Sequence, residues 1–179
     1  KMANINIELE KRKKITIETA YKVGAILLSN FKRPIKFKVK SKGQLVTDID
    51  LKAEERIVRL IKKNFPKDDI LSEEQYYQSF GSDFKWIIDP LDGTHNYIKK
   101  IDIFGTSIAV WFKGEVVLGV IYMPVSSELY FAQRHKGAYC NGRRIFVSKR
   151  RLNEATMIYD SSIRYKKTKM LSSLEKVAD

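Results

Sequence analysis

The feature that most constrains the fold of this chain is a change in the spacing of its apolar residues near Lys85. Before Lys85 the apolar residues recur every three to four positions, which is the period of a helix with one buried face. After Lys85, short runs rich in Val, Ile, Phe and Tyr are separated by Gly, Pro and Asn, as strands are separated by turns. Helices that precede a set of short strands predict an α+β fold.

Two helices are predicted before this change. The first covers residues 5–31 and ends ahead of Pro34, whereas the second begins after a cap at Thr47 or Asp48 and stops before Pro66. Each helix presents one apolar face. The faces consist of Ile17, Ala20, Tyr21, Gly24, Leu27, Leu28 and Phe31 in the first helix and of Ala53, Ile57, Leu60, Ile61 and Phe65 in the second.

The strand-rich half is predicted to form an antiparallel sheet. Lys113-Gly114 and Asn141-Gly142 each lie between two β-rich runs, and dipeptides of this kind form tight hairpin turns. A final helical pattern covers residues 166–179. The predicted strands cover 36–40, 86–89, 106–112, 116–123, 128–133, 137–140 and 143–148.

The composition supports a folded core and excludes several classes of protein. The chain has 179 residues, 44% of them hydrophobic, so roughly 70% of its unfolded surface can be buried on folding. The longest apolar stretch, residues 116–125, is half the length of a membrane span. No apolar signal core is present near residue 1, and Cys140 has no second cysteine with which to form a disulfide. We therefore expect one domain in a cytoplasmic protein that does not bind membranes.

The charge is unevenly distributed along the chain. A net charge of +13 indicates either an anionic partner or a lysine-rich solvated surface. Between Asp68 and Asp92, however, seven acids accompany a single lysine, Lys85. An acidic window of this kind favours a divalent-cation site over a nucleic-acid interface.

The candidate chemistry lies in residues 89–94, Asp-Pro-Leu-Asp-Gly-Thr, where a short strand ends in a rigid bend. Two carboxylates held in one small volume repel each other unless a proton or a cation intervenes. Oxygen ligands select Mg²⁺, with Mn²⁺ as a second choice. Residues 95–100 can begin a short helix whose free N–H groups suit a phosphate. The alternative is a surface turn in which Asp and Gly serve local geometry only.

The segment WIIDPLDGTHNY resembles the W-x-x-D-P-[IL]-D-G-T-x-N-[FY] signature of the inositol monophosphatase-like family of magnesium-dependent, lithium-sensitive phosphatases. The segment LVTDIDLKAEERI resembles the family's L-V-T-x-x-D-x-x-A-E segment, and ILSEEQ resembles its G-E-E segment with Ser72 in place of Gly. Residues 104–148 resemble the sheet that follows. The likeness extends from about Lys14 to the end of the chain.

The resemblance implies a set of metal ligands. Glu73, Asp89 and the carbonyl of Leu91 would hold a first Mg²⁺, and Asp89 would bridge to a second ion that Asp92 also binds. Glu74 would lie behind these ligands or contact a third ion weakly. Two cations about 4 Å apart can stabilise both the attacking and the leaving oxygen of a phosphate ester.

The resemblance also implies which residues act on water and phosphate. Asp50 and Thr94 would orient the attacking water beside Glu73, and the N–H groups of Gly93 and Thr94 would hold the substrate phosphate. The expected fold is the first half of a layered αβαβα sandwich, usually a homodimer. The expected substrate is a small phosphate monoester, with inositol monophosphate ahead of fructose 1,6-bisphosphate, 3′-phosphoadenosine nucleotides and histidinol phosphate.

One departure from the family pattern affects the second metal. The family has a later W-D-x-A-A-G segment whose Asp completes that site, whereas here Trp86 precedes Ile and Trp111 precedes Phe. We therefore expect the sequence to be the N-terminal part of a longer phosphatase. The other interpretation is a protein that works without that ligand.

Three other functions remain open at this stage. The first is a basic module that binds nucleic acid or anionic lipid, although the acidic window disfavours nucleic acid. The second is a non-hydrolysing partner chain of a dimeric phosphatase. The third is a haloacid-dehalogenase-type phosphatase with Asp48 and Asp50 as its acids, which is disfavoured because Lys52 occupies the position of that family's Thr.

Overall fold

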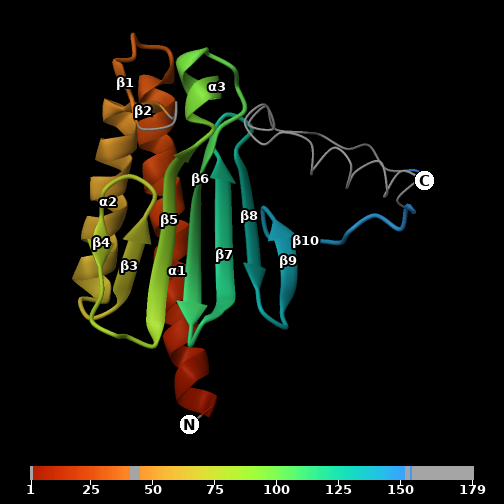
Figure 1. Cartoon of the computed structure of the whole chain (residues 1–179). Helices are drawn as coiled ribbons and strands as arrows, with labels where there is room; N and C mark the ends of the chain where they lie inside the picture. Colours follow the sequence, from red (N-terminus) through yellow and green to blue (C-terminus); the bar gives the residue numbers. More distant parts are fainter. Residues whose placement is uncertain (1, 41–44, 152–153, 155–179) are drawn as a thin grey trace, which may run out of the picture. The chain divides into compact units, whose positions relative to one another are not determined.

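The computed structural model describes residues 2–40, 45–151 and 154, and Figure 1 shows the course of the chain. The chain divides into a unit that ends at Ile145 and a second unit that starts at Phe146. The helices and strands named below all belong to the first unit. The helix predicted over 166–179 lies outside the described residues. No described helix has the length and apolar character needed to cross a bilayer.

The two long helices confirm the prediction made from apolar spacing. They are α1 (Met2–Phe31) and α2 (Asp48–Asn64). α2 begins with a capping box, because the Thr47 side chain accepts the N–H of Asp50 while the Asp50 carboxylate accepts the N–H of Thr47 at 2.8 Å. This box places Asp50 in the first turn of α2 in a fixed orientation. A short third helix, α3 (Thr94–Ile98), follows the bend after residue 92, as the sequence indicated.

The strands form two sheets. A small antiparallel pair consists of β1 (Phe37–Val39) and β2 (Leu45–Thr47). The large sheet has the order β10-β9-β8-β7-β6-β5-β3-β4. Its strands are β3 (Asp69–Ser72), β4 (Tyr77–Gln78), β5 (Phe84–Asp92), β6 (Gly105–Phe112), β7 (Glu115–Met123), β8 (Glu128–Gln133), β9 (Gly137–Cys140) and β10 (Arg143–Ile145).

The expectation of a purely antiparallel sheet is wrong for one pair of strands. β3 and β5 run parallel, with Ile70 opposite Trp86. The reason is the short edge strand β4, which pairs antiparallel with β3 and returns the chain to the starting end of β3 before β5 begins. The other neighbouring pairs are antiparallel. The parallel pair matters for function because it brings the ends of β3 and β5 to the same edge of the sheet.

α1 and α2 cover the same face of the large sheet (Figure 1). Along that face, Ile88, Ile108 and Val120 occupy consecutive register positions on β5, β6 and β7, and all three are buried. On α1 the buried stripe is narrower than predicted. Tyr21 and Leu28 are each 47% exposed, although Tyr21 still contacts the ring of Tyr122 edge-on.

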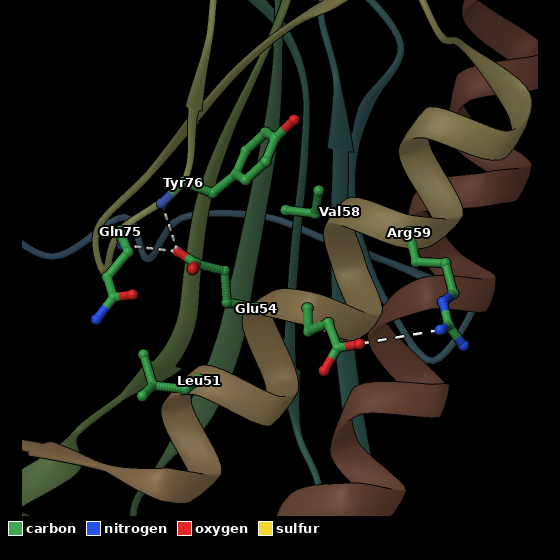
Figure 2. Close-up of a pocket in the computed structure, with 7 residues that line it drawn as sticks. Leu51, Glu54, Val58, Arg59, Gln75 and Tyr76 are labelled. Carbon is green, nitrogen blue, oxygen red and sulfur yellow. Dashed lines mark hydrogen bonds and ion pairs between the residues drawn. The ribbon is translucent and has the colours of Figure 1, made fainter.

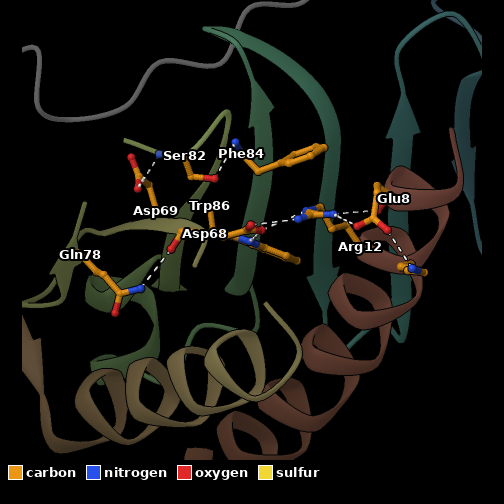
Figure 3. Close-up of polar contacts among 9 residues, drawn as sticks. Glu8, Arg12, Asp68, Asp69, Gln78, Ser82, Phe84 and Trp86 are labelled. Atoms are coloured by element: carbon orange, nitrogen blue, oxygen red, sulfur yellow. Dashed lines mark hydrogen bonds and ion pairs between the residues drawn. The ribbon is translucent and has the colours of Figure 1, made fainter. Parts of the chain in front are cut away.

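A buried polar cluster fastens α1 to the start of β5 (Figure 3). The guanidinium of Arg12 donates two hydrogen bonds to the carboxylate of Asp68, at 3.0 and 2.9 Å. The indole N–H of Trp86 donates to the same carboxylate at 2.8 Å, and Arg12 stacks over the ring of Phe84 at 3.6 Å from its centroid. Bidentate, fully partnered ion pairs of this kind fix orientation. This cluster holds one end of β5 while the candidate site occupies the other.

Candidate active site

The site forms where β5 leaves the sheet. Asp89 pairs with Ser107 of β6 and Asp92 pairs with Gly105, so one extra residue is accommodated between them as a bulge. Gly93 then adopts a φ of 84°, and a Cβ at this position would lie 3.0 Å from the carbonyl oxygen of Ile103. A left-handed backbone with no room for a side chain requires glycine. The bend therefore turns residues 89–94 sharply into α3.

Asp50 and Thr94 come from different elements and meet at the start of α3. The Thr94 hydroxyl lies 3.2 Å from Oδ1 of Asp50 and 3.1 Å from the carbonyl oxygen of Leu91, and donates to both acceptors. Asp50 is fully buried, and this burial raises the pKa of its carboxyl, while hydrogen bonds from Thr47 and Thr94 act in the opposite direction. With its proton directed at acceptors, the Thr94 oxygen presents its lone pairs outward and can accept a hydrogen bond from a water molecule.

Three acidic side chains gather at the ends of β3 and β5. The N–H of Glu73 donates to the carbonyl of Ile88 at 2.9 Å, which extends the parallel pairing and sets Glu73 beside Asp89. Burial raises the pKa of the Asp89 carboxyl to about 8, and the neighbouring Glu73 and Asp92 carboxyls add to the shift. The Oδ1 atom of Asp89 is buried and has no hydrogen-bond partner. A divalent cation bound by oxygen would satisfy that atom and relieve the repulsion.

The donor set fits Mg²⁺ at the first predicted position. Glu73 and Asp89 supply carboxylates that are close enough to share a hydrogen bond, and the Leu91 carbonyl has a second lone pair beyond the one that Thr94 uses. Within the part of the chain that the structure describes, no three Asp, Glu, His or Cys side chains form a ready metal cluster. Asp92, predicted for the second position, is exposed, as is Glu73.

Glu74 lies behind Glu73 and makes an ion pair with Lys40, at the end of β1. Its side chain is only 3% exposed, and burial raises the pKa of its carboxyl in opposition to Lys40. Lys40 thus lies beside the acidic turn, the segment that carries Glu73 and Glu74.

Sequence reasoning missed Glu54, which anchors the acidic turn (Figure 2). Its Oε2 atom accepts the backbone N–H groups of Gln75 at 2.9 Å and Tyr76 at 3.1 Å. Glu54 is buried on α2 one turn after Asp50, so both carboxylates lie on the same side of the helix. A signal was present, because an acid four positions after Asp50 occupies a helix face that packs against the protein.

A cavity of about 360 Å³ lies on the outer side of this anchor. Its lining includes Leu51, Val58 and Arg59 of α2 and the Gln75-Tyr76 segment, and Figure 2 shows these residues around Glu54. None of the predicted metal ligands lines it. Of the aromatic residues that follow the acidic turn, Tyr76 packs against the core, whereas Tyr77 and Phe80 are exposed.

The predicted phosphate donors, the N–H groups of Gly93 and Thr94, lie at the start of α3. Backbone N–H groups in the first turn of a helix lack partners within the helix, so they are available to an anion. Cys140 lies on β9, four strands away from β5, and so is separate from the site. The described structure thus brings Asp50, Glu73, Asp89, Asp92 and Thr94 to one end of the sheet.

Comparisons with known proteins point to one family. The model of the inositol monophosphatase family matches residues 8–177. The chain is 37% identical over 139 residues to the fructose-1,6-bisphosphatase/inositol-1-monophosphatase of Aquifex aeolicus, covering 76% of this chain and 53% of that protein. It is 35% identical over 160 residues to Nus factor SuhB of Pasteurella multocida, covering 88% and 60%. The chain thus spans between half and three fifths of the length of these relatives.

Solved structures give the same result. An IMPase of Thermotoga maritima superposes with a TM-score of 0.74 at 37% identity, over 78% of this chain and 54% of that one. The extragenic suppressor protein suhB of Bartonella henselae superposes with a TM-score of 0.76 at 35% identity, over 79% and 56%. These likenesses confirm the predicted fold class. Because the family model covers nearly the whole chain and both relatives share more than a third of the aligned residues, the chain belongs to the inositol monophosphatase family.

Proposed function

We propose that this chain carries the metal- and water-binding half of a Mg²⁺-dependent phosphatase that hydrolyses a small phosphate monoester, with inositol monophosphate first among the candidates. Family membership supports phosphatase activity in general. The name of the Aquifex relative, a fructose-1,6-bisphosphatase/inositol-1-monophosphatase, supports a small phosphorylated substrate. Cytoplasmic location, lithium sensitivity and a homodimer remain part of this proposal.

One observation carries the proposal: the Asp50–Thr94 hydrogen bond lies beside the crowded Glu73–Asp89 carboxyl pair. A surface turn would require neither the contact across 44 residues nor a buried carboxylate oxygen without a partner. Both features suit metal-assisted hydrolysis of a phosphate ester. One positions the nucleophilic water, and the other holds the cation that stabilises developing negative charge.

The residues would divide the work as follows. Glu73, Asp89 and the Leu91 carbonyl would hold Mg²⁺, and Asp92 would take part in binding a second ion. Mg²⁺ would supply electrostatic stabilisation and a lowered pKa for bound water. Glu74 would support these ligands through its pairing with Lys40.

The remaining residues act on water and phosphate. The Thr94 hydroxyl directs its own proton toward Asp50 and the Leu91 carbonyl. Its oxygen would therefore accept a hydrogen bond from the attacking water. Asp50 would thereby fix the orientation of Thr94 and favour removal of a proton from the water. The N–H groups of Gly93 and Thr94 would bind the phosphate oxygens at the start of α3. Each of these roles depends on the bend that Gly93 permits.

The test is phosphate release from inositol 1-phosphate, fructose 1,6-bisphosphate, 3′-phosphoadenosine 5′-phosphate and histidinol phosphate, with Mg²⁺ and with EDTA. We expect Mg²⁺-dependent release that the D89N variant loses. Thr94→Val should lower kcat by about 10²-fold or more while Thr94→Ser retains most of it, since only the hydroxyl orients water. Release that is unaffected by EDTA would contradict the proposal.

A second candidate function is favoured by the coverage of the relatives. Because the chain spans 53% and 60% of the two proteins compared, the remaining half could supply the second-metal ligand and the substrate contacts. The chain alone would then bind Mg²⁺ without turnover. Calorimetric Mg²⁺ binding that is lost in D89N, without phosphate release, would identify this case.

A further inference from the structure

The cavity beside Glu54 is separate from the candidate active site. Its volume of about 360 Å³ lies at the lower end of the range for cavities that bind small molecules. Its walls come from two elements, α2 and the Gln75-Tyr76 segment (Figure 2). Because none of the predicted metal ligands lines this cavity, a molecule bound in it would not occupy the positions of the metal or the substrate phosphate.

Most of the surface that this cavity presents is apolar. Leu51 and Val58 lie seven positions apart on α2, which is two helical turns, so they form one wall on the same side of the helix. Tyr76 lines the cavity from the other element, and its hydroxyl is engaged elsewhere, because it donates to Oε1 of Gln78 at 2.8 Å. Walls of this kind suit an apolar body and disfavour a strongly hydrated ion.

The cavity also carries one buried charge. Two of its three charged residues, Glu55 and Arg59, lie 3.9 Å apart and are mostly exposed, whereas Glu54 is only 7% exposed. Among the described residues, no lysine, arginine or histidine forms an ion pair with Glu54. Lys62, two turns further along α2, lies over the ring of Tyr76 instead, with Nζ 5.5 Å from the ring centroid. A buried carboxylate without a cationic partner is rare in folded proteins.

The two oxygens of the Glu54 carboxylate have different surroundings. Oε2 accepts the N–H groups of Gln75 and Tyr76. Oε1 accepts no hydrogen bond from the described residues and is not among the fully buried atoms, so it can be reached from the cavity. A cationic N–H donor would make a charge-assisted hydrogen bond to this oxygen, which is stronger than a bond from a neutral donor.

We propose that this cavity binds a small organic cation, with a primary ammonium or guanidinium group on Oε1 of Glu54 and an apolar body between Leu51 and Tyr76. The binding is independent of the proposed phosphatase activity. A divalent metal ion fits poorly, because it requires about six oxygen ligands, and the described residues hold no cluster of three metal-binding side chains. A neutral molecule would leave the charge of Glu54 uncompensated.

The test is a titration of the ¹⁵N-labelled full chain with benzylamine at neutral pH, without Mg²⁺ or substrate. The amide signals of Gln75 and Tyr76 report on the site, because both N–H groups bind Glu54. Benzyl alcohol has a similar size and no charge, and benzoate has the opposite charge. We expect a Kd of about 1 mM or lower for benzylamine, binding of benzyl alcohol that is weaker by about tenfold, and no binding of benzoate.

Three variants locate the charge that is recognised. Glu54→Gln keeps an acceptor for the two N–H groups and should weaken benzylamine binding by about tenfold. Asp83→Asn removes the same charge at an exposed acid that does not line the cavity, and should change the Kd by less than about twofold. Leu51→Lys introduces a tethered ammonium three positions before Glu54, on the same side of α2, and should block benzylamine. Leu51 is 36% exposed, so α2 can accept this change.

Three results would overturn the proposal. Equal affinities for benzylamine and benzyl alcohol would show that the cavity does not recognise charge. Equal Kd values in E54Q and D83N would mean that Glu54 is not the partner of the cation. Amide signals of Gln75 and Tyr76 that do not move would place any binding elsewhere. D89N should bind benzylamine with the affinity of the wild type, so the outcome does not depend on whether the chain hydrolyses phosphate esters.

Discussion

The Oε2 atom of Glu54 accepts the backbone N–H of Gln75 at 2.9 Å, and this contact ties α2 to the turn that carries Glu73. The same oxygen accepts the N–H of Tyr76 at 3.1 Å. Two N–H groups of one turn thus depend on a single buried carboxylate. Asp50 lies one helical turn earlier on the same side of α2, so one helix orients both the water-directing acid and the metal-binding turn.

Glu54→Ala should therefore raise the Mg²⁺ concentration that half-activates phosphate release, and should lower the free energy of unfolding by about 1–3 kcal/mol. Glu54→Gln should retain most of both properties, because its single carbonyl oxygen can accept both N–H groups. Glu55→Ala is the control, since Glu55 is exposed and lies 3.9 Å from its partner Arg59. An E54A variant with unchanged Mg²⁺ activation would show that the turn keeps its shape without this anchor.

The raised pKa of Asp89 predicts a pH dependence of stability in metal-free protein. The folded protein holds this proton up to about pH 8, whereas the unfolded chain releases it near the ordinary value of 3.8. Between these values the unfolded state binds fewer protons, so the free energy of unfolding falls as pH rises from about 4 to 8. Asp89→Asn removes this contribution.

In EDTA, D89N should therefore melt above the wild type at pH 8, and the difference should shrink toward pH 4.5. Mg²⁺ should raise the melting temperature of the wild type at pH 8 and leave that of D89N almost unchanged, because the cation replaces the proton at this carboxylate. Asp102→Asn, at an exposed acid outside the strands, serves as the control. Parallel pH profiles for D89N and the wild type would contradict the assignment.

The contact between Arg12 and Asp68 predicts a large stability effect far from the site. Asp68→Ala removes the acceptor of the Nε and Nη2 groups of buried Arg12 and of the indole N–H of Trp86, and leaves Arg12 paired with Glu8 alone, which should cost about 3–5 kcal/mol in urea unfolding. The exposed pair of Asp83 and Lys113, at 3.6 Å, provides the control, and Asp83→Ala should cost less than about 1 kcal/mol. Similar losses for both variants would mean that the buried cluster contributes no more than a surface pair.

Much of the fold follows from local patterns in the sequence. The capping box at Thr47 and the stop before Pro66 define α2, and Lys113-Gly114 and Asn141-Gly142 form the predicted hairpin turns with positive φ at all four residues. The parallel pairing of β3 with β5 was not predicted. It depends on the two-residue strand β4, which is too short to leave a periodic signal.

The site was predictable to a similar extent. Asp89, Leu91, Asp92 and Gly93 lie in one segment, so their proximity follows from local geometry. The meeting of Thr94 with Asp50 joins residues 44 positions apart, and only the likeness to a family indicated it. Glu54 was missed although its position four residues after Asp50 places it on the packed face of α2, because its partners, the N–H groups of Gln75 and Tyr76, are backbone groups that leave no pattern in the sequence. The roles of these residues in catalysis stay predictions.

Gly93 provides the last prediction, because two separate effects oppose any side chain at this position. Its φ of 84° is strained for other residues, and a Cβ would lie 3.0 Å from the carbonyl oxygen of Ile103 and 3.4 Å from Cα of Phe104. Gly81 has a similar φ of 71°, but a Cβ there would meet no atom within 4 Å. Gly81→Ala should therefore cost only the backbone strain, about 1 kcal/mol, and Gly93→Ala about 2–4 kcal/mol.

The difference between the two glycine variants isolates the crowding at the bend. Because relief of this crowding would move residues 89–94, G93A should also lose phosphate release and Mg²⁺ binding, while G81A keeps both. Urea unfolding and calorimetric Mg²⁺ titration measure the two effects separately. A G93A protein that is as stable as G81A and still binds Mg²⁺ would show that the close approach to Ile103 does not fix the metal-binding bend.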